Sequence, residues 1–177
     1  PPMLGGYASM LARLAREAQA GRLRIAPAQV NSSSETMLPE MRSLITDAFG
    51  VPVLDTFACT EGLVGKTVNG DDVFTFNTDM CIVELVDADN RPVAPGVPSA
   101  TVLVTNLTNL VQPLIRYELS DVFVRQPDAA AHGYLRARVQ GRSDDVLRYS
   151  SAEVHPIVIR SVMVRSPDVI DYQVHQT

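Results

Sequence analysis

Hydrophobic residues in the first third of the chain recur at helical spacing and then in short strand-like runs. Apolar positions three or four apart predict an amphipathic helix over residues 7–20, which Gly21 would end. A second helix is predicted before Gly50, with an apolar side made of Met37, Met41, Leu44, Ile45, Ala48 and Phe49. Apolar runs predict strands at Leu23–Ile25 and Val51–Phe57. Helices that alternate with strands are typical of a parallel α/β arrangement.

The pattern changes after Gly62. Short segments rich in β-branched or aromatic residues alternate with turn-forming clusters, which favours an antiparallel meander or distorted barrel over residues 72–140. The strands expected there are Val73–Phe76, Cys81–Val86, Thr101–Asn106, Asp121–Arg125 and Tyr134–Gln140.

A charged segment, Gly141–Asp145, breaks this β-rich pattern. Beyond it we expect a strand at Val146–Tyr149, a helix at Pro156–Arg165 and a strand at Val169–Gln176. The pattern stops before this unit is complete, which indicates the truncated start of a second domain.

Composition narrows the class of protein. The 177 residues are 46% hydrophobic with a net charge of −5, which is ordinary for a globular protein and argues against nucleic-acid or anionic-membrane binding driven by bulk charge. Cys59 and Cys81 have neither metal-motif nor disulfide spacing, which indicates a reducing, cytoplasmic environment. Asn31 and Asn106 each begin a glycosylation sequon, but no secretory context supports its use. No run is apolar enough to cross a bilayer, and the start without Met predicts a fragment.

The segment Phe57–Gly62 is the first candidate for a ligand site, because ligands bind where buried strands of α/β sheets end. Phe57 can stack on a flat heterocycle, Thr60 can hydrogen-bond a phosphate oxygen, and Glu61 can hold a magnesium ion. A structural interpretation stays open, in which Phe57 belongs to the core and Glu61 is a solvated residue at the start of a helix.

Two further segments carry candidate chemistry. Asp121 is expected at a turn, where its carboxylate can accept two hydrogen bonds from a vicinal diol such as a ribose. Closing the turn is its alternative role. Arg142 lies in the charged break, which is either a hinge with Arg142 reaching a phosphate or ribose, or a solvated linker.

The polar segment Asn31–Glu35 is expected to be a loop that leads into the second helix. Hydroxyl side chains at the start of a helix commonly accept hydrogen bonds from its first amides. Ser34 and Thr36 are therefore candidates either for capping this helix or for contact with a ligand.

Taken in order, these segments resemble the adenylate-forming superfamily, and within it the phenylacetate–coenzyme A ligase-like proteins. The resemblance runs through Ser33–Glu35, Asp55–Gly62, Leu114–Asp121, Gly141–Asp145 and Tyr172–Thr177. It implies the C-terminal part of a large AMP-binding domain over residues 1–142, with an α/β segment at 1–71 and a β-rich segment at 72–142. Residues 143–177 would be the hinge and the truncated start of a small α+β domain.

The resemblance also implies an activity. Members of the family activate a carboxylic acid with ATP and magnesium to form an acyl-adenylate, and they then usually transfer the acyl group to coenzyme A. The expected cofactors are therefore ATP or AMP, Mg²⁺ and coenzyme A, and the expected partner is an aryl or acyl carboxylic acid, in a bacterial, cytoplasmic enzyme. Neither nucleic acid nor a membrane is an expected partner.

The resemblance assigns the adenine side of the site to residues from two segments. Ser33, Ser34 and Glu35 would lie along the adenine ring, and Phe57 would pack near it.

The remaining roles concern phosphate, metal and ribose. Thr60 would contact the adenylate phosphate and Glu61 would bind magnesium, so that these two residues carry the catalysis. Asp121 would hold the ribose hydroxyls with help from Arg142, and Asp144 would be the hinge between the two domains.

The sequence also departs from the family's pattern. The family's phosphate loop would lie upstream of this chain and its catalytic lysine beyond Thr177; Lys66, the single lysine here, follows the Thr60–Gly62 turn and is in the wrong place to replace it. Phe57 and Ala58 stand where many relatives have Tyr-Gly. Preorganised charge-stabilising groups commonly contribute a few kcal/mol each, so we expect this piece alone to be nearly inactive.

Two alternatives to a ligase remain open. One is a member of the same fold that binds nucleotide without turnover or passes the acyl group to a carrier. The other is a β-rich interaction module that shares only the fold. The acid substrate is not indicated by any residue of this chain.

Overall fold

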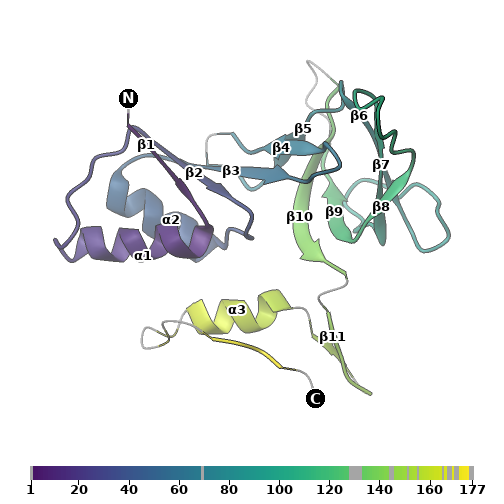
Figure 1. The fold of residues 1–177 in the computed structure, drawn as a ribbon. Helices are drawn as coiled ribbons and strands as arrows, with labels where there is room; N and C mark the ends of the chain where they lie inside the picture. Colours follow the sequence, from purple (N-terminus) through teal and green to yellow (C-terminus); the bar gives the residue numbers. More distant parts are fainter. Residues whose placement is uncertain are drawn as a thin grey trace.

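The computed structural model describes residues 2–68, 70–127, 133–143, 146–150, 152–154, 156–164, 166, 169 and 172–175 (Figure 1). Its elements, in chain order, are β1 (Met3–Gly6), α1 (Ala8–Gln19), β2 (Gln29–Ser33), α2 (Pro39–Phe49), β3 (Val53–Ala58), β4 (Val64–Lys66), β5 (Phe74–Phe76), β6 (Cys81–Val86), β7 (Thr101–Asn106), β8 (Tyr117–Leu119), β9 (Asp121–Arg125), β10 (Arg136–Arg142), β11 (Leu147–Arg148), β12 (Glu153–Val154) and α3 (Pro156–Val164). Every helix in this described part is too short or too polar to cross a bilayer.

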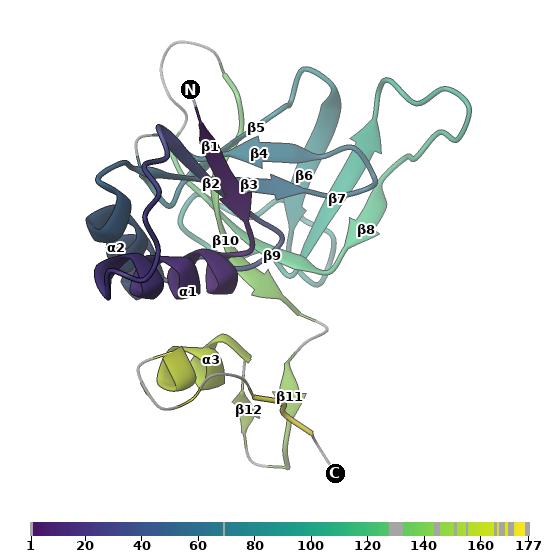
Figure 2. The ribbon, with the colours of Figure 1, turned by 60° about the vertical axis from the view of Figure 1, so that its left-hand side comes forward.

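A seven-stranded sheet in the order β1-β2-β3-β4-β5-β10-β9 forms the frame of the molecule. Strands β1, β2 and β3 are parallel, and the pairings from β3 to β9 are antiparallel. Helices α1 and α2 lie side by side under the parallel strands, as Figures 1 and 2 show. Their buried residues, which include Leu11 and Ile45, pack against Val30 and Val53 of the sheet. The parallel α/β arrangement expected from the sequence is confirmed.

A second, antiparallel sheet in the order β6-β7-β8 packs against the antiparallel part of the first. The core between them includes the stacked rings of Phe76 and Phe123, whose centroids are 4.9 Å apart, together with Val102 and Val104 of β7. The β-rich texture after Gly62 is therefore confirmed. Its strands are divided between two packed sheets, because β5, β9 and β10 extend the α/β sheet.

Three expectations for the N-terminal part are wrong. Leu23–Ile25 is not a strand: the amides of Arg22 and Leu23 both donate to Glu17 O, so the chain is still completing the end of α1. The expected polar loop begins as strand β2, because the β2 backbone pairs on both sides, with β1 and with β3. Helix α2 starts at Pro39 with Leu38 as N-cap, and neither Ser34 nor Thr36 nor any other described side chain caps it.

The C-terminal part agrees with expectation only in part: α3 is the expected helix, and β11 lies within the expected strand Val146–Tyr149. Leu147–Arg148 pairs with Glu153–Val154 in a short hairpin before α3, and the described residues of the expected strand Val169–Gln176 are not in a strand. A strand needs a paired neighbour, and β11 and β12 pair with each other. Figures 1 and 2 show α3 and this hairpin beyond the end of β10.

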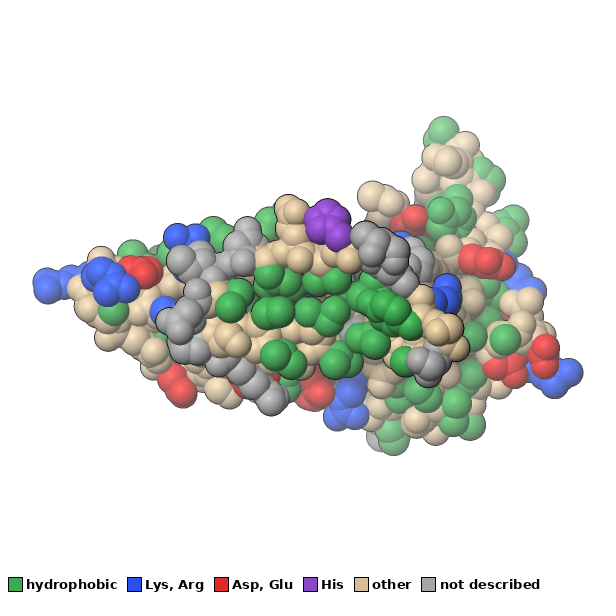
Figure 3. Space-filling view, turned by 90° about the horizontal axis from the view of Figure 1, so that it is seen from below, with side chains coloured by type: hydrophobic (Ala, Val, Ile, Leu, Met, Phe, Trp, Pro, Cys, Tyr) green, Lys and Arg blue, Asp and Glu red, His purple; other side chains and the backbone are tan. Residues whose placement is uncertain are grey.

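Hydrophobic side chains gather across the face that is seen from below in Figure 3. The exposed apolar residues of the C-terminal part include Val158 and Val162 of α3, and also Val169, Tyr172 and Val174. Because Val158 and Val162 are one helical turn apart, they form one apolar stripe on α3.

Candidate functional site

A cleft of about 1350 Å³ opens where β2 and β3 end, between the large sheet and α3. The carboxyl ends of parallel strands meet at one edge of a sheet, and ligands of open α/β sheets bind there. Several charged side chains from distant segments line it: Glu35, Arg42, Asp55, Asp121, Arg138, Arg142 and Arg160.

The structure brings five of the expected ligand contacts to this cleft, namely Ser34, Glu35, Phe57, Asp121 and Arg142. The other expected contacts lie just outside it. Ser33 is the last residue of β2, and Thr60 and Glu61 form the turn after β3. Asp144, the expected hinge, lies outside the described residues.

Asp121 and Arg142 are direct cross-strand partners on β9 and β10. Asp121 begins β9 and is not in a turn, since only Ser120 separates β8 from β9. The register shifts between Val139 and Gly141, which is a β-bulge that sets the direction of the last residues of β10. The amide and the hydroxyl of Ser143 both donate to Ser120 O, at 2.7 and 3.0 Å. Asp121 and Arg142 are therefore held as one unit at the cleft.

The turn Cys59–Gly62 presents Glu61 as an ionised carboxylate. Burial opposes ionisation, but hydrogen bonds from its own amide, the Cys59 thiol and the Thr60 hydroxyl outweigh this and lower the pKa of Glu61, with the charge of Arg142 adding to the effect. The Thr60 Oγ1 to Glu61 Oε2 distance is 3.2 Å. Arg142 thus acts on the Glu61 carboxylate and is also the cross-strand partner of Asp121.

Cys59 lines the cleft as a neutral thiol. Burial raises its pKa to about 11, and the neighbouring Glu61 carboxylate adds to the rise. A thiol with so high a pKa is a poor nucleophile at neutral pH. Its proton is directed to Glu61, so its contribution here is as a hydrogen-bond donor.

Phe57 belongs to the core and also lines the cleft. Its ring meets Phe123 edge-on at 5.4 Å between centroids and Phe76 at 5.7 Å, which anchors it in the core. It is only partly buried, and it also lines the cleft. A ring held by others in this way offers a fixed apolar surface to a ligand.

Glu35 is engaged by two distant elements. Its carboxylate accepts hydrogen bonds from the amide and the hydroxyl of Ser9 in the first turn of α1, at 2.8 and 3.0 Å. It also accepts one from Arg160 of α3 at 2.8 Å. A carboxylate at a helix N-terminus is stabilising, and this one also ties α3 to the large sheet's helical layer.

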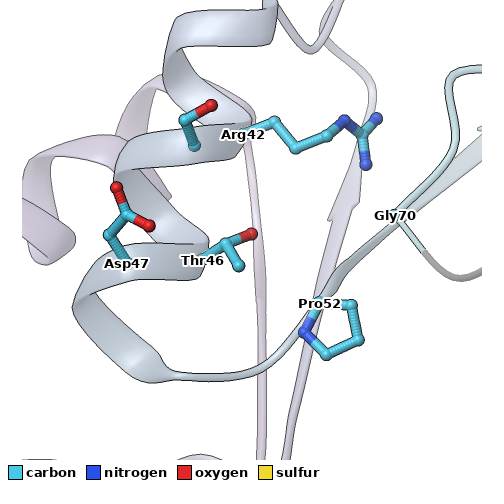
Figure 4. A pocket seen from close by; sticks show the side chains of 6 residues that line it. Arg42, Thr46, Asp47, Pro52 and Gly70 are labelled. Atoms are coloured by element: carbon cyan, nitrogen blue, oxygen red, sulfur yellow. The ribbon is translucent and has the colours of Figure 1, made fainter.

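Arg42 and Asp55 are charged residues of the cleft, and no sequence pattern indicated their roles. Arg42 donates to Val53 O at 2.8 Å and lies 4.0 Å from the Asp55 carboxylate, so it ties α2 to β3. Burial raises the pKa of Asp55, and the charge of Arg42 opposes that rise. A smaller hollow of about 310 Å³ adjoins the cleft here, lined also by Thr46, Asp47 and Pro52 (Figure 4).

Arg138 and Arg160 were also missed. Arg138 binds Asp72 at 2.8 Å, and this pair lines the cleft. One signal was available for Arg160, because it is the single charged residue in the mostly apolar helix Pro156–Val164. For Arg138 no sequence signal existed, since its pairing depends on the register of β10 with β5.

Comparison with known proteins finds similar sequences and a similar solved structure. No family model matches the chain. It is 23% identical to the phenylacetate-coenzyme A ligase of Aromatoleum evansii, over 76% of this chain and 31% of that protein. It is 25% identical to the same enzyme of Escherichia coli strain K12, over 93% of this chain and 44% of that protein. A solved 2-hydroxyisobutyryl-CoA ligase, in the postadenylation state with R3-HIB-AMP, aligns with a TM-score of 0.74 at 23% identity, over 92% of this chain and 37% of that one.

The fold is therefore that of part of an adenylate-forming ligase, which confirms the expected fold class. In sequence the chain is similar to phenylacetate-coenzyme A ligases, which confirms the resemblance. The chain spans 31% of the length of the Aromatoleum evansii protein and 44% of the length of the Escherichia coli protein.

Proposed function

We propose that this chain is the C-terminal part of an ATP-dependent carboxylic acid–coenzyme A ligase, which forms an aryl- or acyl-adenylate and then a thioester. The observation that carries the proposal is the grouping of Asp121, Arg142 and Glu61 from three separate segments beside one cleft. Each was singled out from the sequence by motif, and the register of β9 with β10 supports their acting together.

Different residues of the chain would contact the ribose, the adenine and the phosphate of the nucleotide. Asp121 accepts hydrogen bonds from the ribose hydroxyls, with Arg142 beside it. Phe57 packs near the adenine, and Ser33 and Ser34 lie along the ring. The Thr60 hydroxyl, which donates to Glu61 in this structure, would donate to the adenylate phosphate instead when the nucleotide is bound.

The donor set beside the cleft fits a magnesium ion that is shared with the nucleotide. Mg²⁺ is commonly bound through one or two carboxylates plus substrate phosphates and water. The described residues hold no cluster of three or more metal-ligating side chains, and Glu61 is the carboxylate that we propose for the ion. Its lowered pKa favours the ionised form of Glu61, which is the form that binds magnesium. When bound, the ion would neutralise phosphate charge.

The domain division is part of the proposal. Residues 1–142, comprising the α/β segment 1–71 and the β-rich segment 72–142, would belong to a large domain, and 143–177 would begin a small one with Asp144 as hinge. The large sheet ends with Arg142, and the described strands that follow pair only with each other, which supports a boundary there. Lys66 lies in β4, outside the set of described residues that line the cleft, so the catalytic lysine of the proposed enzyme would come from elsewhere in the protein.

The proposed substrates are ATP, coenzyme A and an aryl or acyl carboxylic acid, in a bacterial, cytoplasmic enzyme. The named activities of the relatives support this choice, and phenylacetate is the first acid to try. Neither nucleic acid nor a membrane is a proposed partner.

ATP–pyrophosphate exchange tests the proposal, measured on the whole protein that contains this chain with a panel of aryl and fatty acids. Exchange should depend on one class of acid. Glu61→Gln and Asp121→Ala should each reduce it roughly a hundredfold. Matched changes at exposed ion pairs outside the cleft, Glu17→Gln and Asp89→Ala, should leave it unchanged. Exchange that survives both site variants would remove the assigned roles.

A further inference from the structure

The main chain of the Thr60–Glu61 turn is held by side chains from the second sheet and from the loop before it. The turn itself has two backbone hydrogen bonds, from Gly62 N to Cys59 O at 3.2 Å and from Cys59 N to Leu63 O at 3.1 Å. These fix its outline but leave the carbonyls of Glu61 and Gly62 for other donors.

Asn106, the last residue of β7, supplies the donor for the Glu61 carbonyl. Its Nδ2 lies 2.8 Å from Glu61 O, across 45 residues of chain. A Cβ built on Gly62 would lie 2.3 Å from the same Nδ2, so the amide rests directly against the turn. Only a residue without a side chain fits at position 62 while Asn106 holds this place.

The side-chain oxygen of Asn106 also has hydrogen-bond partners. Its Oδ1 accepts hydrogen bonds from Thr108 N at 2.8 Å, Thr108 Oγ1 at 3.0 Å and Asn109 N at 2.9 Å. Three donors at one end and a carbonyl at the other fix which way the amide group faces. The side chain therefore links the loop after β7 to the turn after β3.

The next carbonyl is held in the same manner. Asn77 Nδ2 donates to Gly62 O at 3.1 Å, while Asn77 Oδ1 accepts from Val64 N at 2.8 Å. The thiol of Cys81 lies 3.4 Å from Gly62 O. Because the two peptide groups after Glu61 are both held, the backbone that carries the Glu61 side chain is restrained.

We propose that Asn106 is a positioning residue for the Glu61 carboxylate, acting through the Glu61 carbonyl, and that it sets the affinity of the site for magnesium. This inference rests on the proposed function for its metal. Asn106 would touch neither the nucleotide nor the ion. The glycosylation sequon that begins at Asn106 has a structural meaning here, since its Thr108 orients the amide.

The test compares two Asn→Asp changes in one loop. Asn106→Asp keeps the oxygen that Thr108 and Asn109 contact but replaces the donor to Glu61 O by a charged acceptor. Asn109→Asp makes the same charge change at an exposed position whose Oδ1 contact, from Gln112 N at 3.1 Å, is kept. The two variants differ in the hydrogen bond to the turn.

In the whole protein, the Mg²⁺ concentration that gives half-maximal ATP–pyrophosphate exchange should rise roughly tenfold in Asn106→Asp, the equivalent of about 1.4 kcal/mol. The KM for the acid should stay the same, and Asn109→Asp should match the unmodified protein. Thr108→Val removes only the hydroxyl that orients the amide, and it should raise the Mg²⁺ requirement about twofold to threefold. An unchanged Mg²⁺ requirement in the folded variants, or in Thr108→Val alone if Asn106→Asp does not fold, overturns the proposal.

Amide hydrogen exchange of the peptide containing residues 59–63, without nucleotide or metal, gives a second readout. It should speed up several-fold in Asn106→Asp and remain unchanged in Asn109→Asp. If the unmodified protein shows no pyrophosphate exchange with any acid, the proposed function fails. Amide hydrogen exchange then still tests whether Asn106 holds the turn. Equal hydrogen exchange in the two variants means that it does not.

Discussion

Gly62 illustrates how much of the candidate site depends on a single backbone position. It has φ of +99°, in the left-handed region that side chains disfavour, and Asn106 fills the space where a Cβ would lie. Gly96 is the matched comparison, because its φ is +83° but a Cβ there meets no described atom within 4 Å.

Gly62→Ala should therefore be far more destabilising than Gly96→Ala. The strained φ alone should lower the free energy of unfolding by about 1 kcal/mol, the value expected for Gly96→Ala. The added clash should bring the loss for Gly62→Ala to roughly 3 kcal/mol. Urea unfolding measures both, and equal losses would show that Asn106 does not occupy the space beside Gly62.

The Cys59 thiol should resist alkylation. Its pKa of about 11, against an ordinary 9.0, leaves about a hundredfold less thiolate at pH 8 than a free cysteine has. Iodoacetamide labelling followed by peptide mass spectrometry should show slow reaction that accelerates only as the pH approaches the raised pKa. Labelling in denaturant is the control and should proceed at the ordinary rate. Fast labelling of folded protein at pH 8 would contradict the assigned environment.

At the residue scale, the sequence predicted the groups that would meet a ligand but not the groups that hold them. Asp121 and Arg142 were identified by their motifs, and the structure makes them cross-strand partners. Asn106 and Arg160 were not identified, because their contacts join residues 45 and 125 positions apart. Such pairs depend on how separate layers pack, which no local pattern records.

At the element scale, the spacing of apolar residues predicted α1 and the strands β6, β7 and β9 well. In these elements the spacing of the apolar residues matches the face that is buried. It failed for β2, whose Asn and Ser residues have low strand propensity. That strand exists because it is paired on both sides. Tertiary pairing outweighed local preference there.

Glu35 links α1 to α3, and this link gives a prediction at the element scale. Glu35 and Arg160 are partly buried, with 28% and 21% of their side chains exposed, so the pair should contribute roughly 1 kcal/mol. Arg160→Gln should speed amide hydrogen exchange in α3 about fivefold. Glu35→Gln should do the same and also loosen the first turn of α1, where Ser9 loses its partner.

The matched control for this contact is Arg148→Gln, which breaks the exposed pair with Glu153 in the β11–β12 hairpin. It should leave exchange in both helices unchanged. Unaltered exchange of α3 in Arg160→Gln would show that the ion pair does not hold this helix.

At the scale of the whole molecule, the apolar face of Figure 3 predicts self-association of the isolated chain. Val158 and Val162 are 54% and 58% exposed on one stripe of α3, and contiguous apolar surface of this kind promotes association. Light scattering after size exclusion should show a mass that rises with concentration. The double change Val158→Ser and Val162→Ser should reduce this effect, whereas Val97→Ser, at an exposed turn, should not. A monomer at all concentrations would contradict the prediction.

The central claim is that Asp121 and its neighbours form the nucleotide-binding wall of a ligase. Calorimetric titration of AMP into the whole protein tests it most directly, because AMP binding needs no knowledge of the acid. AMP should bind the unmodified protein and Asp89→Ala equally. Asp121→Ala should bind roughly ten- to a hundredfold more weakly, because a carboxylate that accepts two hydrogen bonds is lost. Equal affinity for AMP in Asp121→Ala, or no binding by the unmodified protein, would contradict the account.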